Sequence, residues 1–543
     1  MTFAPRQPSL ARAEVLRAIM LAGLAAALLV ALGPPGGDTA AHLYRTLLVR
    51  EGVHVWDNLW FSGQYPLASY SLLYYLPAAL VGNTPLVVAA VVLSAALFAS
   101  LAVREWGEAA PWPARVFALL SAGPLFTGTY SYALGLAATL AALRLLQAGR
   151  SWLAIVAATL ALGFSPLAFA FLLLILLAVV LARRRLGARA LAIGIGLAAV
   201  ACLQGAALLL FPTEGVYTFS PLSLAAVLTV SALGAAVALR SQRGAVLAVF
   251  FGLWAAISLI AFLIPSPFGD NLTRLRALVF PLVLLTVLLA RFRPRPLAFA
   301  ALAFALAYNV APYVRDGVAR AATTAAAEES FWQPALAFLR ERESADYRVE
   351  VVPTFDHWEA YWVPRAGFAL ARGWYRQIDL AQNPELYRKP LVPAVYRAWL
   401  RRMSVRFVLV PLTRLGPLGA DREAALLRSG RAGLQPVFRS RHWIIFELTD
   451  PVPILTGATP ALIDRLGHER ITGWMSAPGT YRLRIRYTPL WRVGRGRICV
   501  EPATDGMTRL VARRGGPFTL VLPEAPATVV RSAISRRDGT CGR

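Results

Sequence analysis

Long apolar runs follow one another through the first 312 residues of this 543-residue chain. A helix needs roughly 17 to 25 predominantly apolar residues to cross the hydrocarbon core of a bilayer. The sequence therefore predicts an α-helical polytopic membrane protein with about eleven spans, several of them short. The runs lie at 16–33, 85–103, 113–127, 131–148, 152–165, 167–183, 189–211, 220–239, 244–264, 276–291 and 297–312.

The composition separates this chain from soluble proteins and from nucleic-acid binders. Only 15% of its residues are charged and 57% are hydrophobic, whereas about 25% charged is usual in soluble domains. The formal net charge is +26, but proteins that bind nucleic acid gather their basic groups on one polar face. Here the arginines fall between apolar spans and in the C-terminal third. We therefore expect membrane lipids, and no nucleic acid, as partners.

The arginines also predict an orientation. Basic residues precede the first span and then occupy every second connection, which is the positive-inside pattern. This pattern places the N-terminus in the cytoplasm and everything after about residue 313 outside. A cleavable signal peptide is the alternative for the first span, although an uncleaved span fits the alternation. The arginines concerned are Arg6, Arg12, Arg17, Arg104, Arg150, Arg183, Arg184, Arg185, Arg240, Arg243, Arg291, Arg293 and Arg295.

Two extracytoplasmic domains are expected after the spans. Within 313–450, the segments 348–352, 405–411 and 442–447 are typical of short strands and 421–429 of a helix, so a mixed α/β domain is predicted. From residue 451, alternating segments such as 480–487 (TYRLRIRY) and 518–522 predict a small β-sandwich. Cys499 and Cys541 lie in this last domain and either pair, if it is exported, or remain as thiols. No spacing of Cys and His resembles a zinc site.

The first external loop, 34–84, is the polar, aromatic and acidic part of the membrane region. No acidic residue falls in the middle of a span, which argues against an ion-coupled transporter. Asp38 follows the first span directly. It is either the N-cap of a helix or a general base at the membrane surface that accepts a proton from a hydroxyl. His42 shares a helical face with Asp38 and would orient it, pair with it or bind a metal. The amphipathic segment 40–51 is expected to lie on the membrane surface.

The rest of the loop mixes aromatic and polar side chains. Asp57, Trp60 and Tyr65 belong to a stretch, 56–66, that suits either a sugar-binding platform or an aromatic anchor at the membrane interface. Arg45 is either a membrane-surface cation or a substrate ligand.

Segment 37–80 (GDTAAHLYRTLLVREGVHVWDNLWFSGQYPLASYSLLYYLPAAL) resembles the first external loop of GT-C integral membrane glycosyltransferases. In one bacterial group of that superfamily an Asp is followed by His and Arg and then by WD and WF/G-YP stretches. The resemblance extends over the spans to about residue 312. It implies transfer of a sugar from a polyprenyl-phosphate donor to a cell-envelope glycan, lipid or protein outside the membrane, with inversion at the anomeric carbon. Asp38 would be the base, and the loop residues His42, Arg45, Asp57, Trp60 and Tyr65 would contact substrate.

A late external loop, 265–276, resembles the loop of the same group in which an Arg is expected near the donor phosphate. Arg274 and Arg276 fit that role because a guanidinium binds two phosphate oxygens at once. Alternatively, each is a cation at the lipid headgroups.

The family often adds an acidic residue in the next external connection, but 123–130 has none. A divalent cation therefore has no clear ligand set, and Glu51, Asp57 or Glu214 would replace that acid only if the fold brought it close. The alternative function is that of a non-catalytic GT-C-like protein in envelope polysaccharide export or assembly.

Overall fold

A computed structural model of the protein describes residues 8–66, 71–184, 187–211, 215–321, 324–523, 526–535 and 540–541. Arg6, Arg185 and Glu214, which were singled out in the sequence, lie outside these residues. The chain forms two compact units. Unit 1 comprises Met1–Thr39, Tyr70–Ala206 and Val216–Ala321, and unit 2 comprises Ala40–Ser69, Ala207–Gly215 and Ala322–Arg543.

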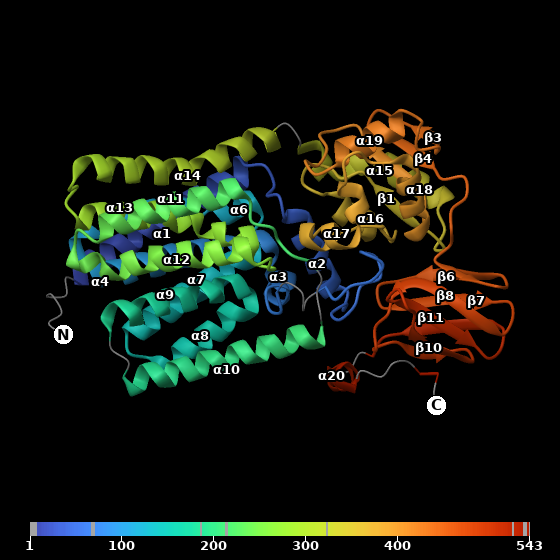
Figure 1. The fold of residues 1–543 in the computed structure, drawn as a ribbon, viewed down its shortest axis with the longest axis horizontal. Coiled ribbons are helices and arrows are strands. Elements are labelled where there is room, and N and C mark those ends of the chain that lie inside the picture. The colour runs from blue at the N-terminus through green and yellow to red at the C-terminus, as the bar shows by residue number, and fades with distance from the viewer. Residues whose placement is uncertain are drawn as a thin grey trace. The chain divides into compact units, whose positions relative to one another are not determined.

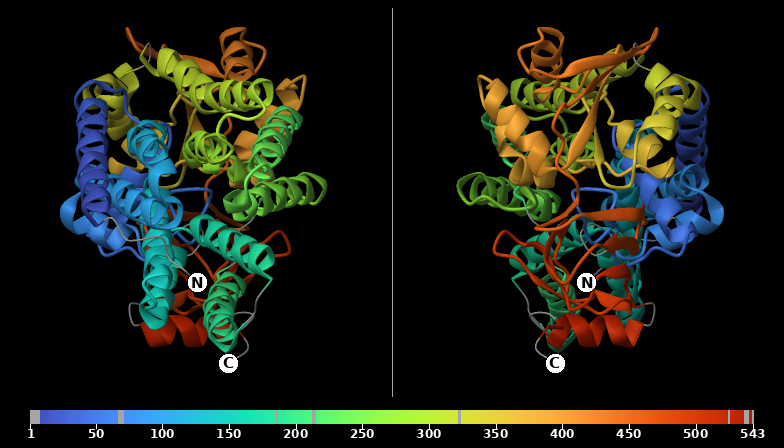
Figure 2. Two further views of the ribbon diagram at one scale, coloured as in Figure 1. Left: turned by 90° about the vertical axis from the view of Figure 1, so that its left-hand side faces the viewer. Right: turned by 90° about the vertical axis from the view of Figure 1, so that its right-hand side faces the viewer.

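Unit 1 is a bundle of helices that run alongside one another (Figures 1 and 2). By length and composition, eight helical segments of the described chain could cross a membrane. They contain α1 (Pro8–Leu32), α4 (Asn83–Trp106), α9 (Pro166–Arg183), α10 (Ala188–Leu210), α11 (Pro221–Ala238), α12 (Ala245–Leu263), α13 (Arg276–Leu289) and α14 (Arg295–Ala321). Shorter helices are α3 (Tyr75–Val81), α5 (Pro111–Leu120), α6 (Gly123–Thr127), α7 (Tyr130–Gln147) and α8 (Ser151–Phe164).

Three of the eleven predicted spans do not form helices of this kind. The run 113–127 is split between α5 and α6. The chain turns at Ser121 and Ala122, and a new helix then begins at Gly123, with Pro124 in its first turn. The run 152–165 forms the 14-residue helix α8. The run 131–148 forms α7, whose last turns carry the polar residues Arg144 and Gln147. The structure thus agrees with the predicted membrane character, since it contains helices long and apolar enough to cross a bilayer. The number of spans and their orientation stay predictions.

A buried ion pair lies near the start of α1. The carboxylate of Glu14 is buried and accepts hydrogen bonds from Nε (2.9 Å) and Nη2 (2.7 Å) of Arg115 in α5. Arg17, one turn further along α1, also pairs with it. A charge removed from water needs such partners, so this pair holds α1 against α5.

The α/β part of unit 2 has a four-stranded sheet in the order β1-β2-β4-β3. β1 (Arg348–Val351) and β2 (Val405–Pro411) are parallel, and β4 (Trp443–Glu447) is antiparallel to both β2 and β3 (Gln435–Arg439). Alternate residues of β2 belong to two different apolar clusters, so both faces of the sheet are covered. The surrounding helices are α15 (Glu329–Arg342), α16 (Glu359–Arg365), α17 (Arg376–Gln382), α18 (Pro393–Arg402) and α19 (Ala420–Arg428).

Helix α2 (Thr39–Arg50) joins this α/β core. Ala40, Ala41, Tyr44 and Leu48 are buried in one cluster with residues of β1, β2 and β4. The sequence predicted that this segment lies on the membrane surface. That prediction is wrong for its apolar face, because the face packs against the α/β domain; amphipathicity alone does not distinguish a protein core from a bilayer.

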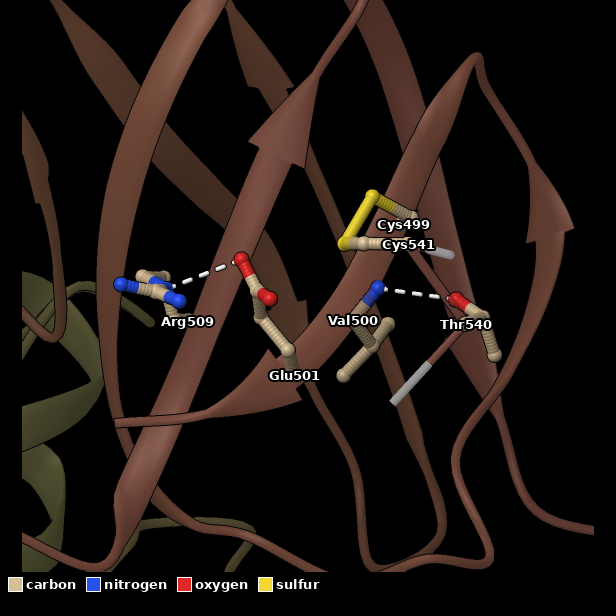
Figure 3. Close-up of a disulfide and its surroundings, with 6 residues drawn as sticks. All are labelled: Cys499, Val500, Glu501, Arg509, Thr540 and Cys541. Atoms are coloured by element: carbon tan, nitrogen blue, oxygen red, sulfur yellow. Dashed lines mark hydrogen bonds and ion pairs between the residues drawn. A yellow bond between two sulfur atoms is a disulfide. The ribbon is translucent and has the colours of Figure 1, made fainter. Parts of the chain in front are cut away.

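The C-terminal part of unit 2 is a sandwich of two antiparallel four-stranded sheets, β10-β11-β8-β5 and β6-β7-β12-β9. The two inner faces share one apolar core. The cysteines Cys499 and Cys541, left open by the sequence, form a disulfide (Figure 3). The elements are β5 (Leu455–Gly457), β6 (Ala461–Leu466), β7 (Arg470–Met475), β8 (Gly479–Arg486), β9 (Arg492–Arg495), β10 (Ile498–Pro502), β11 (Met507–Ala512), β12 (Gly516–Val521) and α20 (Pro526–Ser535).

Candidate functional site

Asp38 lies in the turn between α1 and α2. Its backbone N–H donates to the carbonyl of Thr127 (3.3 Å), which ends α6. The adjacent Thr39 has its hydroxyl 2.9 Å from the hydroxyl of Tyr130, the first residue of α7. The turn that carries the carboxylate is therefore fixed to the connection between α6 and α7.

Two glycines allow this close approach. A Cβ on Gly36 would lie 2.3 Å from the backbone nitrogen of Gly128, and a Cβ on Gly128 would lie 2.5 Å from the backbone nitrogen of Asp38. Gly128 also has a φ of +78°, which residues with a side chain rarely adopt. Side chains at these positions would push the two backbone segments apart, so the glycines place Asp38.

Arg274 brings a cation to Asp38. It belongs to the 3₁₀ segment η3 (Gly269–Leu275), and its Nη2 lies 3.7 Å from Oδ2 of Asp38. The side chains are 25% and 31% exposed. From α7, the hydroxyl of Tyr132 donates to the carbonyl of Arg274 (3.3 Å) and supports the segment. The pair is close enough to attract, but the distance is too long for a hydrogen bond.

Two further guanidinium groups belong to the same end of the unit 1 helices. Arg276 begins α13 and lies over the ring of Tyr308 in α14, 5.0 Å from its centroid. Its carbonyl accepts a hydrogen bond from Asn309 (2.7 Å). Arg320, near the end of α14, donates a hydrogen bond to the carbonyl of Phe126 (2.7 Å). The next residue, Thr127, is the one whose carbonyl accepts from the N–H of Asp38. The sequence did not single out Arg320, because it follows the predicted end of the last span.

These side chains combine one carboxylate with three cations. Guanidinium groups can bind an anion, and Arg is the side chain best suited to bind the oxygens of a phosphate. Among the described residues, no group of three or more His, Cys, Asp or Glu is arranged to hold a metal ion.

The predicted loop residues His42, Arg45, Asp57 and Trp60 are in unit 2, and all four are almost completely buried. Trp60 stacks on Tyr44, with ring centroids 4.5 Å apart, and donates to the carbonyl of Ala360 (3.1 Å). Arg45 lies 4.2 Å from the ring centroid of Tyr375. In this structure these side chains hold the loop inside unit 2. Their contact with substrate stays a prediction, and the structure shows the four side chains buried within unit 2.

The carboxylate of Asp57 accepts three hydrogen bonds within unit 2. It accepts from the hydroxyl of Tyr44 (3.0 Å), the N–H of Leu59 (3.0 Å) and Nδ1 of His468 (2.9 Å). Nε2 of His468 lies 3.4 Å from Glu51. Burial alone would lower the pKa of His468, but the hydrogen bond to Asp57 and the charges of Asp57 and Glu51 outweigh it, so the pKa is raised. The histidine links the loop to the β-sandwich.

Tyr65 also packs into the sandwich. Its hydroxyl lies 2.9 Å from that of Thr488, and its ring meets Trp56 and Phe211 edge-on, at centroid distances of 4.9 and 5.2 Å. Burial raises the pKa of this phenol, which therefore stays protonated and acts as a hydrogen-bonding anchor.

Of the predicted site residues, Asp38, Arg274 and Arg276 belong to unit 1 and the other five belong to unit 2. The structure brings Asp38 and Arg274 together. Comparison of the chain with known protein families and with curated proteins gives no match.

Proposed function

We propose that the protein is a membrane glycosyltransferase that moves a sugar from a polyprenyl-phosphate donor to an acceptor on the extracytoplasmic face. The observation that carries the proposal is the approach of Arg274 to Asp38, at 3.7 Å, at one end of a bundle of membrane-length helices. In this proposal Asp38 is the base and Arg274, beside it, is the phosphate ligand. The apolar helices offer a surface for the polyprenyl chain, and the acceptor is an envelope glycan, lipid or protein.

In this mechanism the hydroxyl oxygen of the acceptor attacks the anomeric carbon while the bond from that carbon to the phosphate oxygen breaks. Asp38 accepts the hydroxyl proton. The leaving polyprenyl phosphate gains negative charge, which Arg274 and Arg276 stabilise as it develops. A single displacement of this kind inverts the anomeric configuration.

The test uses the full chain in nanodiscs with a panel of synthetic polyprenyl-phosphate sugars, and it measures the release of polyprenyl phosphate in the presence of envelope acceptors. Asp38→Asn should abolish turnover while the variant still binds undecaprenyl phosphate. Asp316→Asn is the matched control, because Asp316 is a partly exposed acid of α14 that pairs with the adjacent Arg315 (3.1 Å). Undiminished turnover by Asp38→Asn would remove Asp38 from the mechanism.

The second candidate is a non-catalytic protein of envelope polysaccharide export or assembly. The burial of His42, Arg45, Asp57 and Trp60 favours it, since these side chains support the loop instead of facing a substrate. It predicts that the wild-type chain binds undecaprenyl phosphate but shows no turnover with any donor of the panel.

A further inference from the structure

Helix α20 (Pro526–Ser535), the last helix of the chain, has one exposed and mainly apolar face. Its large apolar side chains there are Val530, 44% exposed, and Ile534, 64% exposed. The opposite face packs on the β-sandwich through Val529, Ser532 and Ala533. The exposed residues recur at the spacing of one helix face, and they are Ala527, Val530, Arg531, Ile534 and Ser535.

The sandwich binds α20 in its second half and binds the chain again beyond the helix. Arg492, at the start of β9, donates a hydrogen bond to the hydroxyl of Ser532. Beyond the helix, the N–H of Thr540 donates to the carbonyl of Val500 (2.7 Å), and the N–H of Val500 donates to the hydroxyl of Thr540 (3.0 Å). The disulfide from Cys541 to β10 follows directly (Figure 3). The exposed face is therefore presented by a fixed element.

Within unit 2, a short series of contacts connects α20 to Phe211. Arg492 also donates to the carbonyl of Trp491 (2.9 Å), whose N–H donates to the carbonyl of Thr488 (3.3 Å). The hydroxyl of Thr488 meets that of Tyr65, and the ring of Tyr65 packs against Phe211. Phe211 directly follows α10, whose residues from Ala207 onward belong to unit 2. The part of the sandwich that carries α20 thus lies near Phe211, which belongs to unit 2 together with Ala207–Leu210.

We propose that α20 lies in the interface of the bilayer that holds the spans of this chain. Val530 and Ile534 enter the acyl boundary, and the guanidinium of Arg531 pairs with lipid phosphate. The charge of the sandwich region fits an anionic surface, since residues 451–543 contain fifteen Arg against six acidic residues. This contact does not depend on the proposed sugar transfer.

A second copy of the chain is a poorer occupant of this face. Two large apolar side chains cover far less than the roughly 800 Å² per partner of a stable protein interface, and a cation within the face would repel its own copy. A bilayer needs no such area, because the candidate spans already anchor the chain in the membrane.

Site-directed spin labelling of the full chain tests the proposal. Cys202, the free cysteine among the described residues, is replaced by Ala, and a nitroxide is attached without reductant to Ile534→Cys in nanodiscs that contain phosphatidylglycerol. The control is Leu462→Cys, an apolar residue of β6 that is 40% exposed. Power saturation then compares access of oxygen, which concentrates in lipid, with access of a water-soluble nickel chelate.

The expected result is an oxygen-to-nickel accessibility ratio at least threefold higher at position 534 than at position 462. A label at Val530→Cys, one turn earlier, should behave like the label at 534, and one at Ser535→Cys should give a lower ratio. Equal ratios at 534 and 462 would overturn the proposal. Strong dipolar broadening at 534 without oxygen preference would also overturn it and would assign the face to a second copy.

Discussion

The guanidinium of Arg274 lies 3.7 Å from the carboxylate of Asp38, although the chain passes through most of the unit 1 helices between them. Both side chains are partly exposed, and an ion pair that water reaches is weak, typically about 0 to 1 kcal/mol. An incoming phosphate can therefore compete with Asp38 for Arg274 at low cost. Such an exchange would release the carboxylate to act as a base.

Replacement of Arg274 should weaken phosphate binding. For Arg274→Gln we expect the Kd for undecaprenyl phosphate to rise about 10-fold to 100-fold, because a charged hydrogen bond contributes about 1.5–3 kcal/mol. Arg274→Lys should keep part of the affinity, since it keeps the charge but loses the two-pronged geometry. Native mass spectrometry of the full chain measures the binding. Arg183→Gln, which breaks an exposed pair with Glu105 (2.9 Å), should leave the Kd unchanged, and an equal loss in this control would contradict the assignment.

Gly128→Ala should displace Asp38. The new Cβ would lie 2.5 Å from the backbone nitrogen of Asp38, so the turn must move in addition to the roughly 1–2 kcal/mol that a left-handed backbone costs an L-residue. We expect turnover to fall more than 10-fold and the melting temperature of the full chain to drop. Differential scanning fluorimetry and the donor panel measure the two effects.

Gly52→Ala separates the steric effect from the backbone effect. Gly52 has the same φ, +78°, but nothing lies within 4 Å of its Cβ position. This variant should lose only the stability that the left-handed backbone costs an alanine, and it should retain turnover. A similar loss of turnover in both variants would show that contact with Gly128 does not place Asp38.

The parts of the fold that the sequence predicted are those set by local patterns. Eight apolar runs coincide with helices of membrane length, and the short apolar run 405–411 locates β2, because both patterns depend on neighbouring residues only. β3 was missed because Pro436 and the exposed Gln435 hide an edge strand.

The site was harder to predict because packing between distant residues determines it. Asp57 has the local appearance of a loop carboxylate, yet His468 and Tyr44 bury it. The Trp60 indole donates to a carbonyl 300 positions away. Local spacing carries no information about such partners. Arg320 was overlooked because it follows the predicted end of the last span.

His468 should make the stability of unit 2 depend on pH. Its pKa in the folded chain is raised above the ordinary 6.5, so its contribution is complete below pH 6.5 and is lost as the pH rises through the folded value. We expect His468→Gln to destabilise the chain by about 1–3 kcal/mol at pH 5.5 and by less at pH 8.5. Thermal unfolding across this range measures the difference. His54→Gln, at an exposed position of the same loop, should show no such trend, and parallel profiles for His468→Gln and wild type would contradict the prediction.

Glu343 should lower the free energy of unfolding at alkaline pH. It caps the end of α15, where a negative charge is unfavourable. One carboxylate oxygen accepts from Ser344 (2.8 Å), and the other is buried without a hydrogen-bond partner among the described residues. Burial raises the pKa of Glu343 from 4.5 to about 8. Between these values the folded chain holds a proton that the unfolded chain has lost, so stability falls as the pH rises, by at most about 1.4 kcal/mol per pH unit.

Glu343→Gln removes this titration and keeps the shape of the side chain. The variant should match wild type near pH 4.5 and exceed it at pH 8.5 by about 2–4 kcal/mol, since each unit of pKa shift corresponds to about 1.4 kcal/mol. Thermal unfolding of the full chain at both pH values measures the gain. Glu341→Gln changes an exposed acid of the same helix and should give no pH-dependent gain. If the Glu343→Gln and wild-type profiles stay parallel, the carboxylate is ionised in the folded chain and has a partner, because a buried charge without one would not be tolerated.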